Sequence, residues 1–345
     1  MTRLQALQAR RQDPRAKMAG INEVYNRLRE PEAVAYLVSA MQPIDPELTQ
    51  LIIAEANRVR DPLRERYPAA GINASFDYQG SVTNDTHILA FSDVDLLAVN
   101  ESFYDVETVQ PGATCYGGDV TADMRRVRTS SVEILRQQFP ASQVDDSNSK
   151  AVKIEGGSLR RKVDVVPSNW WHTDRYVRSR EKEDKGIKVF NNATAERIPN
   201  KPFLHNARIE EKDRRVDGNL RRVVRLLKSL RYDANTRAGT EKVKISSYDI
   251  AGIAYNMTDV LLGASRDQAV RLAVQTLAFL IALEEDPVHR ASIEVPNGMR
   301  KVFCADGATV DGLKQLKGEL VGLLSDVANN VNRPFDKLAE ARVVY

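Results

Sequence analysis

The sequence predicts an α+β fold in which helices come first, a mixed α/β region follows and the C-terminal half is again helical. The pattern of apolar residues supports this order: helical spacing before residue 67, short β-prone runs from about residue 74, and helical spacing again after residue 217. A length of 345 residues is typical of about two domains. We therefore expect one domain over 1–200, with the N-terminal helices and the sheet, and a helical domain over 201–345.

The N-terminal region is expected to be helical up to about residue 67, with a capped helix start at Asp45. β-prone runs follow, and they predict a first strand over 76–79 and a second strand within 88–99. Proline and glycine pairs over 111–118 then indicate a loop. The apolar residues that support the N-terminal helices are Val24, Leu28, Ala35, Leu37, Val38 and Met41.

The clearest local feature is a β-hairpin, which follows a helix expected over 121–138. Residues 151–155 form its first strand, the Gly-Gly-Ser turn at 156–158 reverses the chain, and 159–166 returns. The period-two alternation of a strand places Asp164 on the face opposite its two valine neighbours.

The segment 172–215 is polar, charged and rich in asparagine, and we expect it to be a connector that runs over the surface. Beyond it, apolar residues again recur at helical spacing. The expected C-terminal helices are 217–233, 247–262, 266–284 and 311–339.

Composition excludes several classes of protein. The net charge is +3, from 50 basic and 47 acidic side chains, so no global field attracts nucleic acid or a membrane surface. Cys115 and Cys304 fit neither a disulfide framework nor a zinc cluster, and four scattered histidines make a zinc enzyme improbable. The most apolar stretch, 273–283, is too short to span a bilayer, and the N-terminus lacks the apolar core of a secretory signal. We therefore expect a cytoplasmic protein.

Asp93 and Asp95 carry the strongest chemical signal. In a strand, residues two apart project from the same face, so these carboxylates would stand side by side. Adjacent carboxylates repel each other unless a cation lies between them. An isolated Asp-x-Asp is more often a solvated pair. Here the pair lies in an apolar run and the hairpin supplies Asp164, so we interpret the three carboxylates as ligands of a divalent metal ion such as Mg²⁺.

Gly80-Ser81 follows the first predicted strand and precedes the aspartate pair. Glycine lets backbone N–H groups approach phosphate oxygens, and serine adds a hydroxyl donor. The alternative is a plain turn. The position of these residues, shortly before the carboxylates, favours a phosphate-binding role.

The helix expected over 217–233 carries a basic stripe, because Arg221, Arg225 and Lys228 fall at i, i+4 and i+7. A solvated face explains the two arginines equally well. Lys228 borders the apolar seam and is the better candidate to bind a triphosphate. At the next helix start, Ser247 and Tyr248 either belong to an ordinary cap or bind phosphate and stack on a base.

Together, these motifs resemble those of a known superfamily. Gln79-Gly80-Ser81, Asp93-Val94-Asp95 and the 163–167 segment VDVVP look like the DNA polymerase β-type nucleotidyltransferase pattern. The segments 222–228 and 246–248 are similar to the C-terminal helical half of the CD-NTases, the bacterial relatives of cyclic GMP–AMP synthase and oligoadenylate synthetase. The likeness covers roughly residues 20 to 330.

The resemblance implies a palm-like mixed sheet with flanking helices, a C-terminal helical domain that faces it, and an active site between them. It also implies that Asp93, Asp95 and Asp164 hold two Mg²⁺ ions, for which Mn²⁺ can substitute. Asp164 is then the best-placed base for the attacking hydroxyl. The nucleotide-binding residues that the resemblance implies are Gln79, Gly80, Ser81, Lys228, Ser247 and Tyr248.

The implied reaction joins NTPs into a cyclic di- or trinucleotide without a template and releases pyrophosphate. ATP and GTP are the first expected substrates, and pyrimidine nucleotides come after them. In the family, such products are second messengers that activate an effector in anti-phage (CBASS-type) defence, sometimes with accessory regulatory proteins. The chain has no zinc-ribbon insertion like that of the animal DNA-sensing enzyme, so activation by long double-stranded DNA is not expected.

Three alternatives to a cyclic product stay open at the level of sequence. The first is a nucleotidyltransferase with a linear product, which adds nucleotides to RNA or AMP to a protein. The second is a sugar transferase, which also uses Asp-x-Asp with a metal but predicts neither Gly80-Ser81 nor Asp164. The third is a non-catalytic nucleotide- or RNA-binding module that uses Arg221, Arg225 and Lys228.

Overall fold

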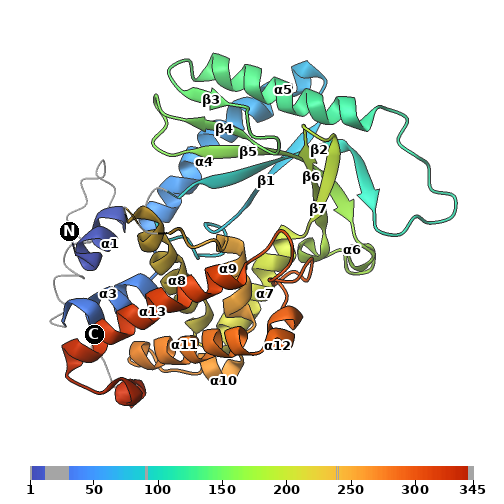
Figure 1. The fold of residues 1–345 in the computed structure, drawn as a ribbon. Coiled ribbons are helices and arrows are strands. Elements are labelled where there is room, and N and C mark those ends of the chain that lie inside the picture. Colours follow the sequence, from blue (N-terminus) through green and yellow to red (C-terminus); the bar gives the residue numbers. More distant parts are fainter. Residues whose placement is uncertain (1, 12–30, 90–91, 238, 240, 341–345) are drawn as a thin grey trace. The chain divides into compact units, whose positions relative to one another are not determined.

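A computed structural model describes residues 2–11, 31–89, 92–237, 239 and 241–340 (Figure 1). Val24 and Leu28 lie outside the described residues. The chain folds into two compact units. The unit that we call the sheet unit consists of Asp45–Asn84 and Phe91–Ala207, and the helical unit consists of Met1–Ile44, Asp85–Ala90 and Arg208–Tyr345.

Within the described residues, the sheet unit contains a mixed sheet of seven strands. The main path has the order β1-β2-β5-β4-β3, and β6 pairs with both β5 and β7. β2 and β5 are parallel, whereas the other pairs are antiparallel. The strands are β1 Ala74–Gln79, β2 Val94–Val106, β3 Gln143–Asp145, β4 Val152–Glu155, β5 Val163–His172, β6 Gly186–Asn191 and β7 Glu196–Asn200.

Two helices, α4 (Pro46–Arg66) and α5 (Val120–Gln138), share a buried core with one face of this sheet (Figure 1). Val94 and Leu96 of β2 belong to that core, whereas Leu97 packs in a separate cluster on the other face. Asp95 is two residues before Leu97 and therefore lies on the face that α4 and α5 leave uncovered.

The predicted hairpin is confirmed, since β4 and β5 are antiparallel with Lys153 opposite Asp164. The second strand begins at Val94, inside the expected range of 88–99, and it continues beyond that range to Val106. The first strand and the helix predicted over 121–138 are confirmed within two residues at each end.

The prediction of a surface connector over 172–215 is wrong. This segment contains α6 (Asp174–Ser179), the strands β6 and β7, and α7 (Pro202–Arg215), which leads into the helical unit. β6 pairs with the second half of β5, and it buries Ile187 and Phe190. Its apolar residues Ile187, Val189 and Phe190 form only a short run between polar and charged neighbours, and the pairing with β5 makes this run a strand.

The core of the helical unit surrounds α8 (Asn219–Thr236). The helix predicted over 217–233 has its apolar face buried, namely Leu220, Val223, Val224, Leu227 and Leu230. Residues from α1 (Arg3–Arg11) and α3 (Glu32–Met41) join this core, so these two N-terminal helices group with the C-terminal ones, whereas α4 packs with the sheet. Among the described residues, the remaining α-helices of this unit are α9 Ser247–Tyr255, α10 Asp259–Leu262, α11 Ala269–Glu285, α12 Pro287–Ser292 and α13 Val310–Val331, and a 3₁₀ turn covers Phe335–Glu340. Two further 3₁₀ turns, Pro68–Ala70 and Lys182–Asp184, belong to the sheet unit.

No helix in the described part of the chain combines the length and the apolar character that crossing a membrane requires. The apolar stretch 273–283 instead lies in α11, whose buried side chains pack in the helical core. Cys115 and Cys304 are both exposed thiols without a disulfide partner.

Replacing Leu227 by alanine is expected to lower the free energy of unfolding by about 3 kcal/mol, because the substitution leaves a cavity in a close-packed core. Leu227 is completely buried in the helical unit. Ile281→Ala is the matched control, since Ile281 on α11 is 36% exposed and should lose about 1 kcal/mol or less. Urea denaturation of both variants measures the difference, and equal losses would contradict the burial described for α8.

Candidate active site

Asp95 and Asp164 lie side by side on the parallel strands β2 and β5. The register pairs Asp95 directly with Asp164, so both side chains project from the same face of the sheet. The side chain of Asp164 is 17% exposed, and Asp95 is also largely buried. Asp93 directly precedes β2 instead of lying inside the strand, and its side chain is 49% exposed. The predicted strand positions of Asp95 and Asp164 are confirmed, whereas the predicted strand position of Asp93 is wrong, because β2 begins only at Val94 and Asp93 lies on the loop before it.

These carboxylates perturb one another. Burial, together with the charges of Asp164 and Asp93, raises the pKa of Asp95 to about 7. Burial also raises the pKa of Asp164, against the opposing effect of Lys162. Asp164 Oδ1 is buried and has no hydrogen-bond partner within the described residues. The cluster thus carries negative charge that lacks full compensation.

A lysine that the sequence interpretation missed lies in this cluster. The Nζ atom of Lys162 is 2.6 Å from Asp93 Oδ2 and 3.8 Å from Asp164 Oδ1. Burial alone lowers the pKa of Lys162, but the hydrogen bond to Asp93 and the charge of Asp164 raise it above the usual lysine value. The sequence could have indicated this contact, because Lys162 is two residues before Asp164 and residues two apart in a strand point to the same face.

Gly80 fits tightly against the carboxylate of Asp95. It follows Gln79, the last residue of β1, which pairs with Asp95 in the sheet. Its φ angle is +93°, a conformation that residues with a side chain rarely adopt, and an added Cβ would lie 3.1 Å from Asp95 Oδ2. Thr83 Oγ1 donates a hydrogen bond to the carbonyl of Gly80 at 2.8 Å, which fixes the turn that contains Ser81. A glycine is therefore required beside Asp95.

The donor chemistry of the cluster fits a hard divalent cation. Its groups are carboxylate oxygens, one of them buried without a hydrogen bond, and burial and mutual repulsion raise the pKa of Asp95. Among the residues that the structure describes, no three acidic, histidine or cysteine side chains are already arranged as a metal-binding cluster. The ammonium of Lys162 instead contacts the carboxylates.

Lys228 belongs to the helical unit and is only 6% exposed. Its Nζ donates a hydrogen bond of 2.5 Å to the carbonyl oxygen of Thr86 in the same unit. Burial, with the charges of Arg231 and Arg225, lowers the pKa of Lys228 to about 7. The interpretation of Lys228 as part of a basic stripe beside the apolar seam did not anticipate that its side chain is buried.

Ser247 and Tyr248 begin α9, also in the helical unit. Ser246, not Ser247, caps this helix by accepting a hydrogen bond from the backbone N–H of Asp249. Ser247 Oγ accepts a hydrogen bond from Arg231 at 2.9 Å. The hydroxyl of Tyr248 donates to Asn297 Oδ1 at 2.9 Å, and burial raises the pKa of Tyr248.

The two arginines of the stripe have structural partners. Arg221 forms ion pairs with Asp213, at 2.9 Å, and with Glu210. Arg225 is buried and donates to the carbonyl oxygens of Met41 and Asp85. The interpretation of Arg225 as part of a solvated face is therefore wrong, because its guanidinium satisfies backbone carbonyls of the helical unit. A nucleic-acid-binding stripe built on both arginines is also disfavoured.

Lys228→Met is expected to remove a pH-dependent contribution to the free energy of unfolding. The pKa of Lys228 is lowered from 10.5 to about 7 in the fold, so between these values the unfolded chain binds one more proton. The free energy of unfolding of the wild type therefore rises relative to that of the variant as the pH rises, by about 1.4 kcal/mol per pH unit at most. Urea unfolding of both proteins at about pH 6.5 and about pH 9 measures this change. A difference that is independent of pH would contradict the buried position.

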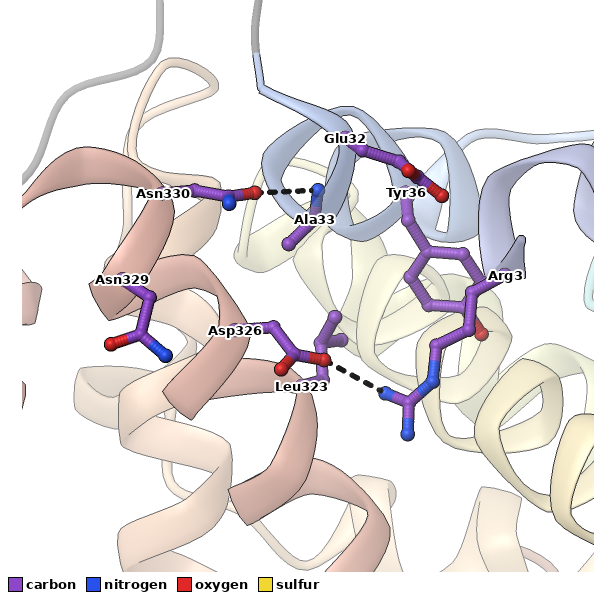
Figure 2. A pocket seen from close by; sticks show the side chains of 8 residues that line it. All are labelled: Arg3, Glu32, Ala33, Tyr36, Leu323, Asp326, Asn329 and Asn330. Atoms are coloured by element: carbon purple, nitrogen blue, oxygen red, sulfur yellow. Dashed lines mark hydrogen bonds and ion pairs between the residues drawn. The ribbon is translucent and has the colours of Figure 1, made fainter.

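A separate pocket of about 370 Å³ lies within the helical unit (Figure 2). Among the described residues that line this pocket, Arg3 is the basic one, and it lies 3.9 Å from Asp326 and 3.5 Å from Glu319. Because Arg3 is already close to two carboxylates, it offers little attraction for a triphosphate. The pocket is lined by Arg3, Glu32, Ala33, Tyr36, Leu323, Asp326, Asn329 and Asn330.

Comparison with known proteins places the chain in a family. The sequence model of the cGAS/DncV-like nucleotidyltransferase C-terminal helical domain (CD_NTase_C) matches residues 207–324. The cyclic dinucleotide synthase CdnE of Yersinia aleksiciae is 36% identical over 297 residues, which are 84% of this chain and 75% of that protein. A c-di-GMP synthase of a Lachnospiraceae bacterium is 30% identical over 66% of this chain and 69% of its own length.

A solved structure agrees with these sequence matches. The STING-associated CdnE c-di-GMP synthase from Capnocytophaga granulosa superposes with a TM-score of 0.75 and 25% identity, and the match covers 96% of this chain and 98% of that chain. The mixed sheet with flanking helices and the C-terminal helical domain fit a polymerase β-like α+β fold, as predicted. The chain belongs to the CD-NTase family, and it is a nucleotidyltransferase of the kind that makes cyclic oligonucleotides.

Proposed function

We propose that this enzyme condenses nucleoside triphosphates into a cyclic dinucleotide at the carboxylate cluster of Asp93, Asp95 and Asp164, and releases pyrophosphate. The main observation that supports this proposal is the strand register, which pairs Asp95 with Asp164 and places Gly80 next to Asp95. Two of the relatives described above are c-di-GMP synthases, so GTP is the first substrate to test, and ATP the second.

Enzymes of this family generally depend on a divalent metal ion. We propose that the three aspartates hold two Mg²⁺ ions, or Mn²⁺ in their place. Such ions neutralise charge on the transferred phosphoryl group and on the pyrophosphate that leaves. Gly80 and Ser81 would donate their backbone N–H groups and the serine hydroxyl to phosphate oxygens.

Asp164 is the proposed base for the attacking ribose hydroxyl. The hydroxyl oxygen forms a bond to the α-phosphorus, the bond to pyrophosphate breaks, and the hydroxyl proton passes to Asp164. Burial raises the pKa of Asp164, which favours its acceptance of a proton near neutral pH. A second, equivalent transfer at the same carboxylates would close the ring. We propose that Gln79 supports the glycine turn, and that Lys228, Ser247 and Tyr248 bind phosphates and a base from the helical unit.

The proposed biological role is anti-phage signalling of the CBASS type, in which the cyclic product activates an effector. The substrates are nucleotides of the cytoplasm, and we propose that the reaction takes place there. We also propose that accessory regulatory proteins bind this enzyme and control its activity.

Product analysis tests the proposed reaction directly. The purified protein is incubated with each labelled NTP, alone and in pairs, in Mg²⁺, Mn²⁺ or EDTA, then treated with phosphatase and examined by mass spectrometry. We expect a phosphatase-resistant product that contains guanine, and no product in EDTA. A product with a phosphatase-sensitive end would indicate linear transfer. Nucleotide binding without any product, equal in Mg²⁺ and EDTA, would indicate a non-catalytic module.

A further inference from the structure

Lys162 occupies a position that a cation between the carboxylates would take. Its Nζ atom lies 2.6 Å from Asp93 Oδ2 and 3.8 Å from Asp164 Oδ1, so one ammonium is within ion-pair distance of both. The side chains of Lys162 and Asp93 are 24% and 49% exposed, so the ion pair between them is partly open to solvent.

The contact between Lys162 and the aspartates offsets repulsion among their negative charges. Asp95 and Asp164 lie near the starts of β2 and β5, Asp93 directly precedes β2, and burial together with the charges of Asp164 and Asp93 raises the pKa of Asp95. The ammonium of Lys162 reduces this repulsion by direct contact when no metal ion is present, and the charge of Lys153 also acts on Asp164. This contact does not neutralise the carboxylates fully, because Asp164 Oδ1 is buried and no described residue gives it a hydrogen bond.

We propose that Lys162 is the built-in counter-ion of the metal-free site, and that a divalent cation must displace its ammonium from Asp93 and Asp164 in order to bind. This inference rests on the proposed function, because it takes the three aspartates as the metal ligands. The lysine thereby lowers the intrinsic metal affinity of the enzyme without touching the metal. A partly exposed ammonium–carboxylate pair is weak, so a divalent ion can displace it.

The proposal predicts that removing the ammonium strengthens metal binding. Lys162→Met is expected to bind Mn²⁺ about five-fold more tightly than the wild type in the absence of nucleotide, a ratio that matches a typical exposed ion pair. In EDTA, the same variant should unfold at a lower temperature than the wild type, since the carboxylates then repel one another without compensation. Saturating Mn²⁺ should remove most of that difference.

Lys153→Met is the matched control. Lys153 lies on β4 directly opposite Asp164, so this change removes the same charge from the neighbouring strand. The structure pairs the carboxylates of Asp93 and Asp164 with Lys162, and we expect Lys153→Met to change Mn²⁺ affinity by less than about two-fold.

Mn²⁺ titration of the full-length metal-free protein, followed by electron paramagnetic resonance, measures these affinities. Asp95→Asn is titrated in parallel to separate the inference from the proposed function. If Asp95→Asn loses Mn²⁺ binding while Lys162→Met binds no more tightly than the wild type, the counter-ion role of Lys162 is wrong and the metal site stands. If Asp95→Asn binds Mn²⁺ as the wild type does, the proposed metal site itself is wrong, and the counter-ion role with it.

Discussion

Replacing Asp95 by asparagine is expected to reduce the formation of cyclic product by about 10³-fold or more, with the fold intact. The amide keeps the size of the side chain but loses the negative charge that would hold a divalent ion, and such ions contribute several kcal/mol to the stabilisation of a transition state. Burial and the neighbouring carboxylates raise the pKa of Asp95 to about 7, and removing its charge relieves both effects. The variant should therefore be at least as stable as the wild type in EDTA.

Asp61→Asn provides the matched control for this loss. Asp61 lies on α4 of the same unit, where its carboxylate forms exposed ion pairs with Arg60 and Arg64. The same change of aspartate to asparagine should leave product formation within about two-fold of the wild type, because exposed pairs contribute little. Initial rates from labelled GTP measure both variants. An active Asp95→Asn enzyme would remove the chemical basis of the proposed function.

Gly80→Ala is expected to reduce the rate of nucleotide joining by about 10- to 100-fold. A Cβ at this position would lie 3.1 Å from Asp95 Oδ2, and the φ angle of +93° is strained for any residue with a side chain. The turn or the carboxylate must therefore move, and a displacement of about 1 Å at a reacting centre can cost about 10²-fold in rate.

Gly112→Ala is the control that distinguishes the effect of the contact with Asp95 from the effect of backbone strain at a positive φ angle. Gly112 also has a positive φ angle, of +81°, but an added Cβ there meets nothing within 4 Å. Both variants should lose comparable stability in thermal unfolding, whereas Gly80→Ala alone should lose activity. Equal activities in the two variants would mean that the approach of Gly80 to Asp95 has no catalytic consequence.

Local patterns were sufficient to predict much of the fold. The hairpin around Asp164, the strand before Gly80 and the apolar face of α8 each depend on residues that are close in sequence. The strand alternation that separates Asp164 from Val163 and Val165 is also confirmed, since both valines lie in the core shared with α4 and α5.

Features that depend on distant partners could not be predicted. The strand β6 depends on its pairing with β5, and α1 and α3 join the helical core through contacts that no local pattern specifies. The burial of Lys228 and Arg225 has the same origin, because their partners Thr86 and Met41 are far away in the sequence. A basic residue beside an apolar seam looks the same whether it is solvated or buried against carbonyl groups.

The location of bound Mn²⁺ tests most directly whether the three aspartates form a catalytic metal site. Anomalous scattering from a crystal of the wild-type protein with Mn²⁺ and a non-hydrolysable GTP analogue would locate the ions. We predict Mn²⁺ coordinated by carboxylate oxygens of Asp93, Asp95 and Asp164 together with phosphate oxygens of the analogue. Mn²⁺ and triphosphate bound elsewhere, with Asp95 and Asp164 making no contact to either, would contradict the assignment of the active site.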